Sequence, residues 1–445
     1  MRVDRRTFLK VAASAGLSAA APLWPSRAFG AVDPYEGPFY VMITAAGGWD
    51  PIFLTDPKAE PDLNRHTTDI GRAGEITFAP NPVDPIDLGL DPAFEADYRA
   101  HLMSNQAFFE KHGPRLLVLN GVDTSTNNHE AGSRSIWSGR IPGGYPAFGA
   151  LVAAAKAPEA PMPFVSAGGF DATANVVPLV RIRNVNALRN AAFPERLNAA
   201  DPASPTYHRP ATTARIRRYR AERLAAQRAK QNLPRIKGAM GRLELARGAD
   251  DVLSSLIIPE SLVEVPGNQL NDLQGMMQQT QLAFAAFRSG LAVSANLAIG
   301  GFDTHGNHDR DQVRQIAKIL KGVDYVWEEA ERSGLADKVV VVVGSDFGRG
   351  PAYNGGNPNS GKDHWPVTSV LLMGQGIRGG RMVGGTDESV RARAIDPSSL
   401  ALSDGGVKLA PGHLHHSLRH LSGVDETEVG ARFPLPGQRL PLLQG

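Results

Sequence analysis

Short apolar runs alternate along the chain with longer segments in which apolar residues recur every three or four positions. The short runs are bounded by Gly or polar residues and predict buried β-strands at residues 38–46, 116–120, 292–299, 338–343 and 366–373. The longer segments predict amphipathic helices at residues 92–112, 129–138, 145–156, 268–290, 311–333 and 413–421. Such alternation is typical of one α/β domain, with a doubly wound, mainly parallel sheet flanked by helices.

The pattern is clearest at residues 311–343. Apolar residues from Val313 to Trp327 follow helical spacing, and Gly334 suits the C-terminal cap of this helix. The run of five valines that follows predicts a strand buried on both faces, as at the centre of a parallel sheet. Residues 51–85, by contrast, are rich in Pro, Asp and Gly and predict a loop.

A basic segment interrupts the regular alternation. Residues 207–247 hold twelve Lys and Arg but only two acids, Glu222 and Glu244. This composition indicates a solvated helical insertion, or else a patch for an anionic ligand. We therefore expect residues 31–445 to form a single domain with a basic, partly helical insertion around residues 170–265.

The overall charge and the absence of cysteine narrow the classes of protein. Residues 1–30 hold five basic residues and one acid, and the rest of the chain holds 42 basic and 44 acidic residues, a net charge of −2. Nothing in this balance favours nucleic acid as a partner. The chain has no cysteine, which excludes disulfides, zinc–thiolate sites and a cysteine nucleophile.

The N-terminal thirty residues have the pattern of an export signal. The run Asp4-Arg5-Arg6-Thr7-Phe8-Leu9-Lys10 resembles the twin-arginine signal, and a mild apolar stretch follows from residue 11 to residue 23. This stretch is too short to cross a bilayer, so we expect no stable membrane span. We expect a signal peptide at residues 1–30, the twin-arginine export machinery as a partner and a periplasmic or secreted mature protein; a basic N-terminal helix is the alternative.

Acidic and histidine residues follow the ends of several predicted strands. The four motifs are Gly47-Gly48-Trp49-Asp50, Gly300-Gly301-Phe302-Asp303-Thr304-His305-Gly306-Asn307-His308, Gly344-Ser345-Asp346-Phe347-Gly348-Arg349 and Lys362-Asp363-His364-Trp365-Pro366. Ligands of open α/β sheets collect beyond the carboxyl ends of the strands, where Asp and His commonly bind metal. The alternatives are helix-capping roles for Asp50 and Asp346 and a surface position for His308.

These motifs together resemble the alkaline phosphatase and sulfatase superfamily. The segment from Val323 to Gly348 is similar to the helix, strand and metal-binding turn of sulfatases, and His364-Trp365-Pro366-Val367 resembles a late metal-binding histidine motif. Within the superfamily, the Gly-Gly-Phe-Asp-Thr-His and Ser-Asp-Phe-Gly-Arg motifs most resemble an exported bacterial family, domain of unknown function 1501. The resemblance covers most of residues 38–425 and implies an alkaline phosphatase-like fold.

The resemblance also implies roles for individual residues. It suggests a site for zinc, manganese or calcium, with ligands from Asp50, Asp303, His305, His308, Asp346 and His364. Two departures stand out: Phe347 replaces a metal-binding histidine, and His129 occupies the position of the nucleophile. We expect His129 to serve as a ligand or an acid/base near the other site residues, and Arg349 to contact an anionic oxygen or to form a surface salt bridge.

Two functions are therefore in competition. The first is an exported, metal-dependent hydrolase that acts on small phosphate or sulfate esters. The second is a non-catalytic metal- or ligand-binding protein on a decayed sulfatase-like scaffold, which the altered turn and the absent nucleophile favour.

Overall fold

The computed structural model describes residues 34–83, 87–181, 184–248, 253 and 256–444 of the chain. The predicted signal peptide lies outside these residues. Contacts divide the chain into two compact units, one of which contains residues 210–248 and the other residues 33–209 and 249–445. That residues 31–445 form one domain with a basic insertion around residues 170–265 stays a prediction.

The larger unit is built on an eight-stranded sheet with the order β12-β4-β11-β8-β1-β7-β5-β6. Its strands are β1 (Phe39–Ala45), β4 (Leu116–Asp123), β5 (Phe164–Ser166), β6 (Leu179–Arg181), β7 (Ser294–Ile299), β8 (Val339–Ser345), β11 (Val367–Gly374) and β12 (Arg381–Gly384). Strand β11 is antiparallel to both its neighbours, and every other pairing in the sheet is parallel. The predicted doubly wound, mainly parallel sheet is therefore confirmed.

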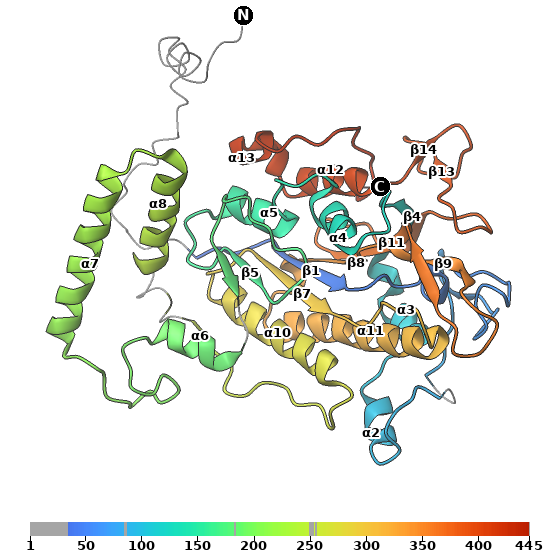
Figure 1. Cartoon of the computed structure of the whole chain (residues 1–445), viewed down its shortest axis with the longest axis horizontal. Coiled ribbons are helices and arrows are strands. Elements are labelled where there is room, and N and C mark those ends of the chain that lie inside the picture. Colours follow the sequence, from blue (N-terminus) through green and yellow to red (C-terminus); the bar gives the residue numbers. More distant parts are fainter. Residues whose placement is uncertain (1–33, 84–86, 182–183, 249–252, 254–255, 445) are drawn as a thin grey trace, which may run out of the picture. The chain divides into compact units, whose positions relative to one another are not determined.

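Helices cover both faces of the sheet (Figure 1). One face packs against α3 (Asn105–His112), α10 (Asn271–Arg288) and α11 (His308–Arg332), and the other against α4 (His129–Ser138), α5 (Phe148–Lys156) and α12 (Pro411–Leu421). Strand β1 serves both cores, because successive side chains of a strand point to opposite faces. Val41 and Ile43 lie in the first core, and Tyr40 and Met42 lie in the second.

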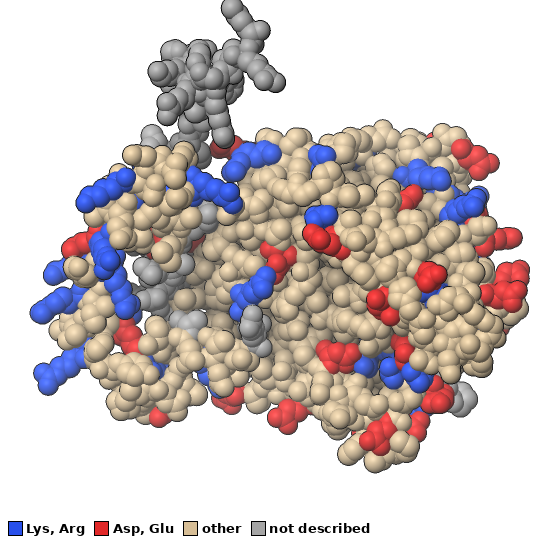
Figure 2. Space-filling view, in the orientation of Figure 1, with Lys and Arg blue, Asp and Glu red and all other residues tan. Residues whose placement is uncertain are grey.

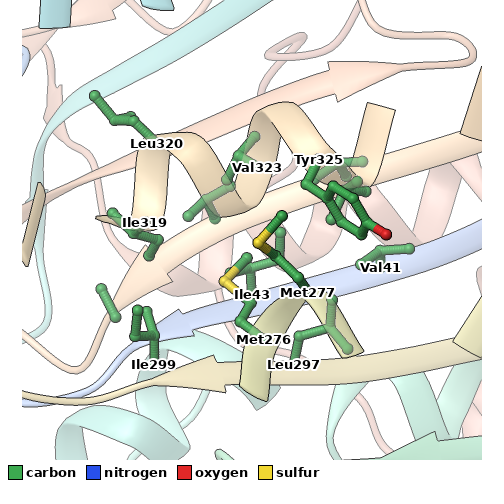
Figure 3. Packing of buried hydrophobic residues seen from close by; sticks show 14 of the residues in the cluster. Val41, Ile43, Met276, Met277, Leu297, Ile299, Ile319, Leu320, Val323 and Tyr325 are labelled. Atoms are coloured by element: carbon green, nitrogen blue, oxygen red, sulfur yellow. The ribbon is translucent and has the colours of Figure 1, made fainter. Parts of the chain in front are cut away.

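The first core is closed by two long helices. Figure 3 shows methionines of α10 and aliphatic residues of α11 packed over β1 and β7, where the cluster includes Met276, Met277, Ile319, Leu320 and Val323. All five side chains are at most 5% exposed. This packing fixes the starts of the loops that leave β1 and β7 at their carboxyl ends.

The remaining helices and strands belong to neither the sheet nor the helices that cover it. They are η1 (Pro51–Phe53), β2 (Gly71–Ala73), β3 (Ile76–Phe78), α2 (Glu95–Ala100), η2 (Gly113–Arg115), α6 (Val185–Ala192), α7 (Pro210–Lys230), α8 (Pro234–Gly248), η3 (Ala336–Lys338), β9 (Gly348–Tyr353), β10 (Lys362–Trp365), β13 (Ala394–Ile395), β14 (Val407–Lys408), η4 (Val424–Glu426) and α13 (Glu428–Ala431). No helix among the described residues is both long enough and apolar enough to cross a membrane.

Three local predictions need correction. The single helix predicted at residues 92–112 is two helices, α2 and α3, because Ser104 leaves the helical conformation and caps α3 by accepting from the N–H of Ala107. The loop predicted at residues 51–85 contains η1 and the β2–β3 hairpin. The β9–β10 hairpin was not predicted, since its strands are short and polar.

Candidate metal centre

Four chain segments bring chemical groups to one edge of the sheet. Asp303 follows β7, Asp346 follows β8 and His129 begins the helix after β4, so all three lie beyond the carboxyl ends of strands that run in the same direction. His364 precedes β11, which runs the opposite way, and therefore reaches the same edge. The predicted convergence of these motifs at one edge is found in the structure.

Asp303 is the centre of the cluster. Its Oδ1 atom lies 3.0 Å from His364 Nε2 and 3.1 Å from His305 Nε2, and the two Nε2 atoms are 2.9 Å apart. On the other side, Asp303 Oδ2 lies 3.5 Å from His129 Nε2. Asp303, His129 and His364 thus form one compact group of potential ligands. The distances among Asp303, His305 and His364 make a second, tighter triangle.

The hydrogen bonds of the Nδ1 atoms of His364 and His305 determine which tautomer each ring adopts. His364 Nδ1 lies 2.9 Å from the carbonyl oxygen of Asn127, and His305 Nδ1 lies 3.2 Å from Asp363 Oδ1. Both oxygens only accept hydrogen bonds, so each Nδ1 atom carries a proton and donates it. In the neutral rings, both Nε2 lone pairs then face each other and the Asp303 carboxylate.

This arrangement of lone pairs fits a bound cation. Two protons cannot both sit between Nε2 atoms that are 2.9 Å apart, and without a cation or an extra proton the lone pairs repel the carboxylate. A divalent metal would bond to all three atoms at once. Their separations of 2.9–3.1 Å are close to the ~3.3 Å between ligands of a tetrahedral zinc ion. Imidazole nitrogens suit zinc better than calcium, which takes oxygen ligands, and manganese would be held chiefly by the carboxylate.

His129 is paired with the buried carboxylate of Asp346. His129 Nδ1 donates to Asp346 Oδ2 at 2.5 Å, while Asp346 Oδ1 accepts from the N–H of Gly47 at 3.1 Å and from the hydroxyl of Ser345 at 3.0 Å. Asp346 is therefore an orienting carboxylate behind His129, and the Nε2 atom of His129 faces Asp303. The predicted proximity of His129 to the other site residues is found.

Asp303 remains ionised over a wide pH range. Burial raises the pKa of its carboxyl, but the hydrogen bond and positive charge of Arg349, together with the neighbouring His364 and His305, outweigh burial and lower the pKa to about 2. The side chain is still 48% exposed, and those of His129 and His305 are 43% and 48% exposed. The group can therefore meet a dissolved ligand while it keeps a fixed negative charge.

Arg349 has a different position from the one predicted. Its side chain is completely buried and donates to the carbonyl oxygens of Gly47, Gly48 and Lys362 as well as to Asp303 Oδ1 at 2.6 Å. These bonds fasten Asp303 to the Gly47-Gly48 turn. The structure thus places Arg349 behind Asp303, as an orienting group, and neither on the surface nor open to a substrate oxygen.

Asp50 and His308 form a separate buried cluster with Lys362. Asp50 Oδ2 accepts from Lys362 Nζ at 2.8 Å and from His308 Nε2 at 3.0 Å, and Asp50 Oδ1 caps η1 at the N–H of Ile52. All three side chains in this cluster are 0% exposed. Burial raises the pKa of Asp50, but the charge of Lys362 and the hydrogen bonds from Lys362 and His308 outweigh burial, so the pKa of Asp50 lies below its usual value.

The predicted metal ligands therefore divide into two groups. Asp50 and His308 do not join the Asp303 centre, because Lys362 neutralises Asp50, and both nitrogens of His308 are used: Nε2 donates to Asp50 and Nδ1 accepts from the Thr304 hydroxyl at 2.7 Å. The alternative capping role of Asp50 is the one found. Lys362 was visible in the sequence next to His364, but nothing in the sequence indicated that its chain would turn toward Asp50.

Phe347 takes the place of the expected third histidine. Its ring is buried, with its centroid 4.7 Å from that of His129 and 4.4 Å from that of His364. It packs against both imidazoles, whose own centroids are 4.6 Å apart, and offers no ligand atom. The side chains around Asp303 therefore offer ligand atoms for one metal ion, and Phe347 offers none for a second ion.

A cavity of about 410 Å³ opens at the same edge of the sheet. Its walls come from the loop after β5, from the end of β6 and from α10, and include Ser166, Asp171, Arg181, Gln278 and Gln279. Strand β5 is two strands from β1, which places the cavity about 10 Å to the side of the β1 turn. Its lining is mixed, with one ion pair between Arg181 and Asp171 at 3.0 Å.

The fold and this cluster define an α/β protein with a candidate His/Asp metal centre at the carboxyl edge of a mainly parallel sheet. The chain belongs to the family described as "Protein of unknown function (DUF1501)", which matches residues 40–433. The predicted family is thus confirmed. No curated protein matches the chain.

Solved structures similar to this chain are sulfatases and members of the alkaline phosphatase superfamily. A sulfatase from Pseudoalteromonas sp. is 10% identical, with 91% of this chain and 73% of that chain covered and a TM-score of 0.38. An alkaline phosphatase superfamily protein from Vibrio parahaemolyticus is 10% identical, with 95% and 76% covered and a TM-score of 0.33. The TAB5 alkaline phosphatase, solved with magnesium bound, is 8% identical, with 77% and 92% covered and a TM-score of 0.31. At these scores, the activity has to be inferred from the site.

Proposed function

We propose that this protein is an exported, metal-dependent hydrolase of phosphate or sulfate esters. One observation carries the proposal: the Nε2 atoms of three imidazoles converge on the Asp303 carboxylate, and the Nδ1 proton of each ring is held by an oxygen behind it. Outer hydrogen bonds of this kind orient metal-binding histidines.

The roles divide between the two sides of Asp303. Asp303, His305 and His364 would hold the ion, because their three atoms make the tighter triangle. A divalent metal there would polarise a phosphoryl or sulfuryl oxygen as a Lewis acid. His129 stands on the other carboxylate oxygen and would accept a proton at Nε2, since Asp346 holds its Nδ1 proton in place. Arg349 would position Asp303 from behind.

The organic part of the ester has room at the same edge. The cavity beside β5 has hydroxyl, amide and charged groups in its wall, which suits a polar, hydroxyl-bearing alcohol better than an apolar one. Such a substrate would lie across the β1–β7 edge, with its anionic group at the Asp303 centre.

A second candidate function is metal or ligand binding without catalysis. It is favoured by the identity of the side chains around Asp303, which are imidazoles, Arg349 and the ring of Phe347, with no hydroxyl nucleophile among the described contacts of this carboxylate. Thr124, a nearby candidate, is buried and its hydroxyl donates to backbone carbonyls. A hydrolase with this site would need water as its nucleophile.

Turnover of aryl phosphate and aryl sulfate esters by metal-loaded protein separates the two functions. The hydrolase proposal expects metal-dependent release of the aryl alcohol, and a loss of about 10²–10⁴-fold for His129→Ala if His129 is the proton acceptor. His420→Ala, which changes an exposed histidine of α12, should keep full activity. Metal bound at Asp303 with no turnover of any ester would favour the binding protein instead.

A further inference from the structure

The hairpin formed by α7 and α8 carries a charge opposite to that of the rest of the predicted mature chain. Residues 210–248 hold eleven basic and two acidic residues, a net charge of +9. Residues 31–209 and 249–445 together hold 31 basic and 42 acidic residues, a net charge of −11. The positive charge is therefore concentrated in one helical hairpin, and the residues of the Asp303 centre all belong to the other unit.

Most of this charge is not used in ion pairs. The two acids of the hairpin are paired, Glu222 with Arg218 at 3.7 Å and Glu244 with Arg228 at 2.8 Å. In the part of the hairpin that the structure describes, six further cations are exposed and have no acidic partner: Arg215, Arg220, Arg223, Lys230, Arg235 and Lys237. Figure 2 shows Lys and Arg side chains over the visible face of this hairpin, with few acids among them.

The connection between the two helices also exposes apolar side chains. Leu233, between α7 and α8, is 59% exposed, and Ile236, in the first turn of α8, is 42% exposed. Lys230, Arg235 and Lys237 lie within a few residues of both. Exposed apolar side chains surrounded by cations are costly in water but favourable at the boundary between lipid headgroups and acyl chains.

We propose that the tip of the α7–α8 hairpin, residues 230–237, docks on an anionic lipid bilayer. The lysines and arginines would bind the lipid phosphates, and Leu233 and Ile236 would enter the layer below the headgroups. A soluble polyanion would use the same charges but would leave the two apolar side chains in water. A second copy of this chain, through its acidic larger unit, would likewise use the charges alone.

Cosedimentation of the full chain with vesicles tests the proposal. The chain should bind vesicles that contain phosphatidylglycerol, should bind pure phosphatidylcholine vesicles far more weakly, and should be released by high salt. Each Lys or Arg near an anionic surface adds roughly fivefold to the binding constant, so Arg235→Gln with Lys237→Gln should weaken binding about 30-fold. The matched control, Arg391→Gln with Arg393→Gln, removes two exposed arginines from the larger unit and should change binding less than twofold.

The apolar tip distinguishes lipid from the other partners. Leu233→Ser with Ile236→Ser should weaken binding to the anionic vesicles several-fold and leave binding to heparin, a soluble sulfated polymer, unchanged. Equal loss in the hairpin and control charge variants would overturn the proposal. So would vesicle binding that is insensitive to the serine substitutions, or a hairpin that changes the oligomeric state of the chain and not its vesicle binding. All variants keep residues 1–30, so any vesicle binding by the basic residues of that segment is the same in every variant and does not affect the comparison.

Discussion

At the scale of single residues, the candidate centre depends on groups that lie behind the imidazoles. The carbonyl of Asn127, the Asp363 carboxylate and the Asp346 carboxylate each hold one Nδ1 proton. Two of these three groups belong to the motifs, since Asp346 was a predicted ligand and Asp363 adjoins His364, but the third is a backbone oxygen. A neutral ring without such a partner exchanges freely between tautomers, whereas each of these oxygens favours the tautomer with its proton on Nδ1.

A different buried histidine should govern part of the acid sensitivity of the fold. Burial lowers the pKa of His415 to about 3, although its Nε2 donates to the Ile136 carbonyl at 2.8 Å. Between pH 6.5 and 3 the unfolded state binds a proton that the folded state does not, so stability falls as the pH falls. We expect His415 to account for roughly 2–3 kcal/mol of the loss between pH 7 and pH 4.5.

Urea unfolding at a series of pH values checks this expectation. The His415→Gln variant keeps a donor near Ile136 but has no group that titrates in this range. Its stability should fall less steeply than that of the wild type below pH 6.5. Parallel curves for the two proteins would contradict a neutral, buried His415.

Several site residues could be predicted from the sequence, but their division between the Asp303 centre and the buried Asp50 cluster could not. Asp303, His305, His364 and His129 were indicated by motifs and register, and the structure brings all four together. Asp50 fits the motif equally well. Its assignment to another cluster depends on Lys362, a long side chain whose direction is set by the β9–β10 hairpin and has no signature in the sequence.

At the scale of secondary-structure elements, strong periodicity gave reliable predictions. The valine strand β8 and helix α11 lie within three residues of their predicted bounds at each end, because each has a long apolar pattern. The polar hairpin β9–β10 has no such pattern and is held by its contacts with the β1 and β7 loops. Sequence periodicity finds elements that pack on the core and misses those that form through polar contacts.

Helix α4 approaches the Asp346 turn closely through Gly132. A Cβ atom added at Gly132 would lie 2.2 Å from the carbonyl oxygen of Asp346. Gly132→Ala should therefore move α4 away from the turn, cost about 1–3 kcal/mol of folding stability and weaken metal binding by displacing His129 or the Asp346 turn. Gly143→Ala, at an exposed glycine with open space around it, is the control and should stay within about 0.5 kcal/mol of wild type. Equal stability of both variants would contradict this close contact.

The Asp50–Lys362 pair should stabilise the connection between β1 and β10. Lys362→Met leaves a buried carboxylate without its cation and should cost about 3–5 kcal/mol in urea unfolding. The double variant Asp50→Asn with Lys362→Met should recover part of this loss, because no isolated charge remains. Asp50→Asn alone should keep the bound metal; loss of the metal would restore Asp50 as a ligand, as the resemblance to phosphatases implies.

At the scale of the whole molecule, function depends on where the chain is delivered. Residues 1–30 lie outside the described structure, so the twin-arginine signal and the periplasmic or secreted location remain proposals from the sequence. A signal of this kind suits a protein that folds and takes up its metal before export.

Delivery can be measured by fractionation of cells that express the full chain. Arg5→Lys with Arg6→Lys keeps the charge of the segment but removes the twin-arginine pair, and should leave the precursor in the cytoplasm. Arg2→Lys, outside the pair, should have no effect. Unchanged delivery of the double variant would exclude the twin-arginine route.

The central claim is that the Asp303 centre binds a divalent metal, and metal content per chain tests it most directly. We predict about one zinc or manganese ion per wild-type and His420→Ala chain, and a large loss in Asp303→Ala and His364→Ala. A metal that binds only the folded state also stabilises it, by about 2.7 kcal/mol at a hundred times its dissociation constant, so the wild-type melting temperature should rise when metal is added back. The account would be contradicted if the wild-type chain held no metal and its melting temperature stayed constant in zinc, manganese and calcium.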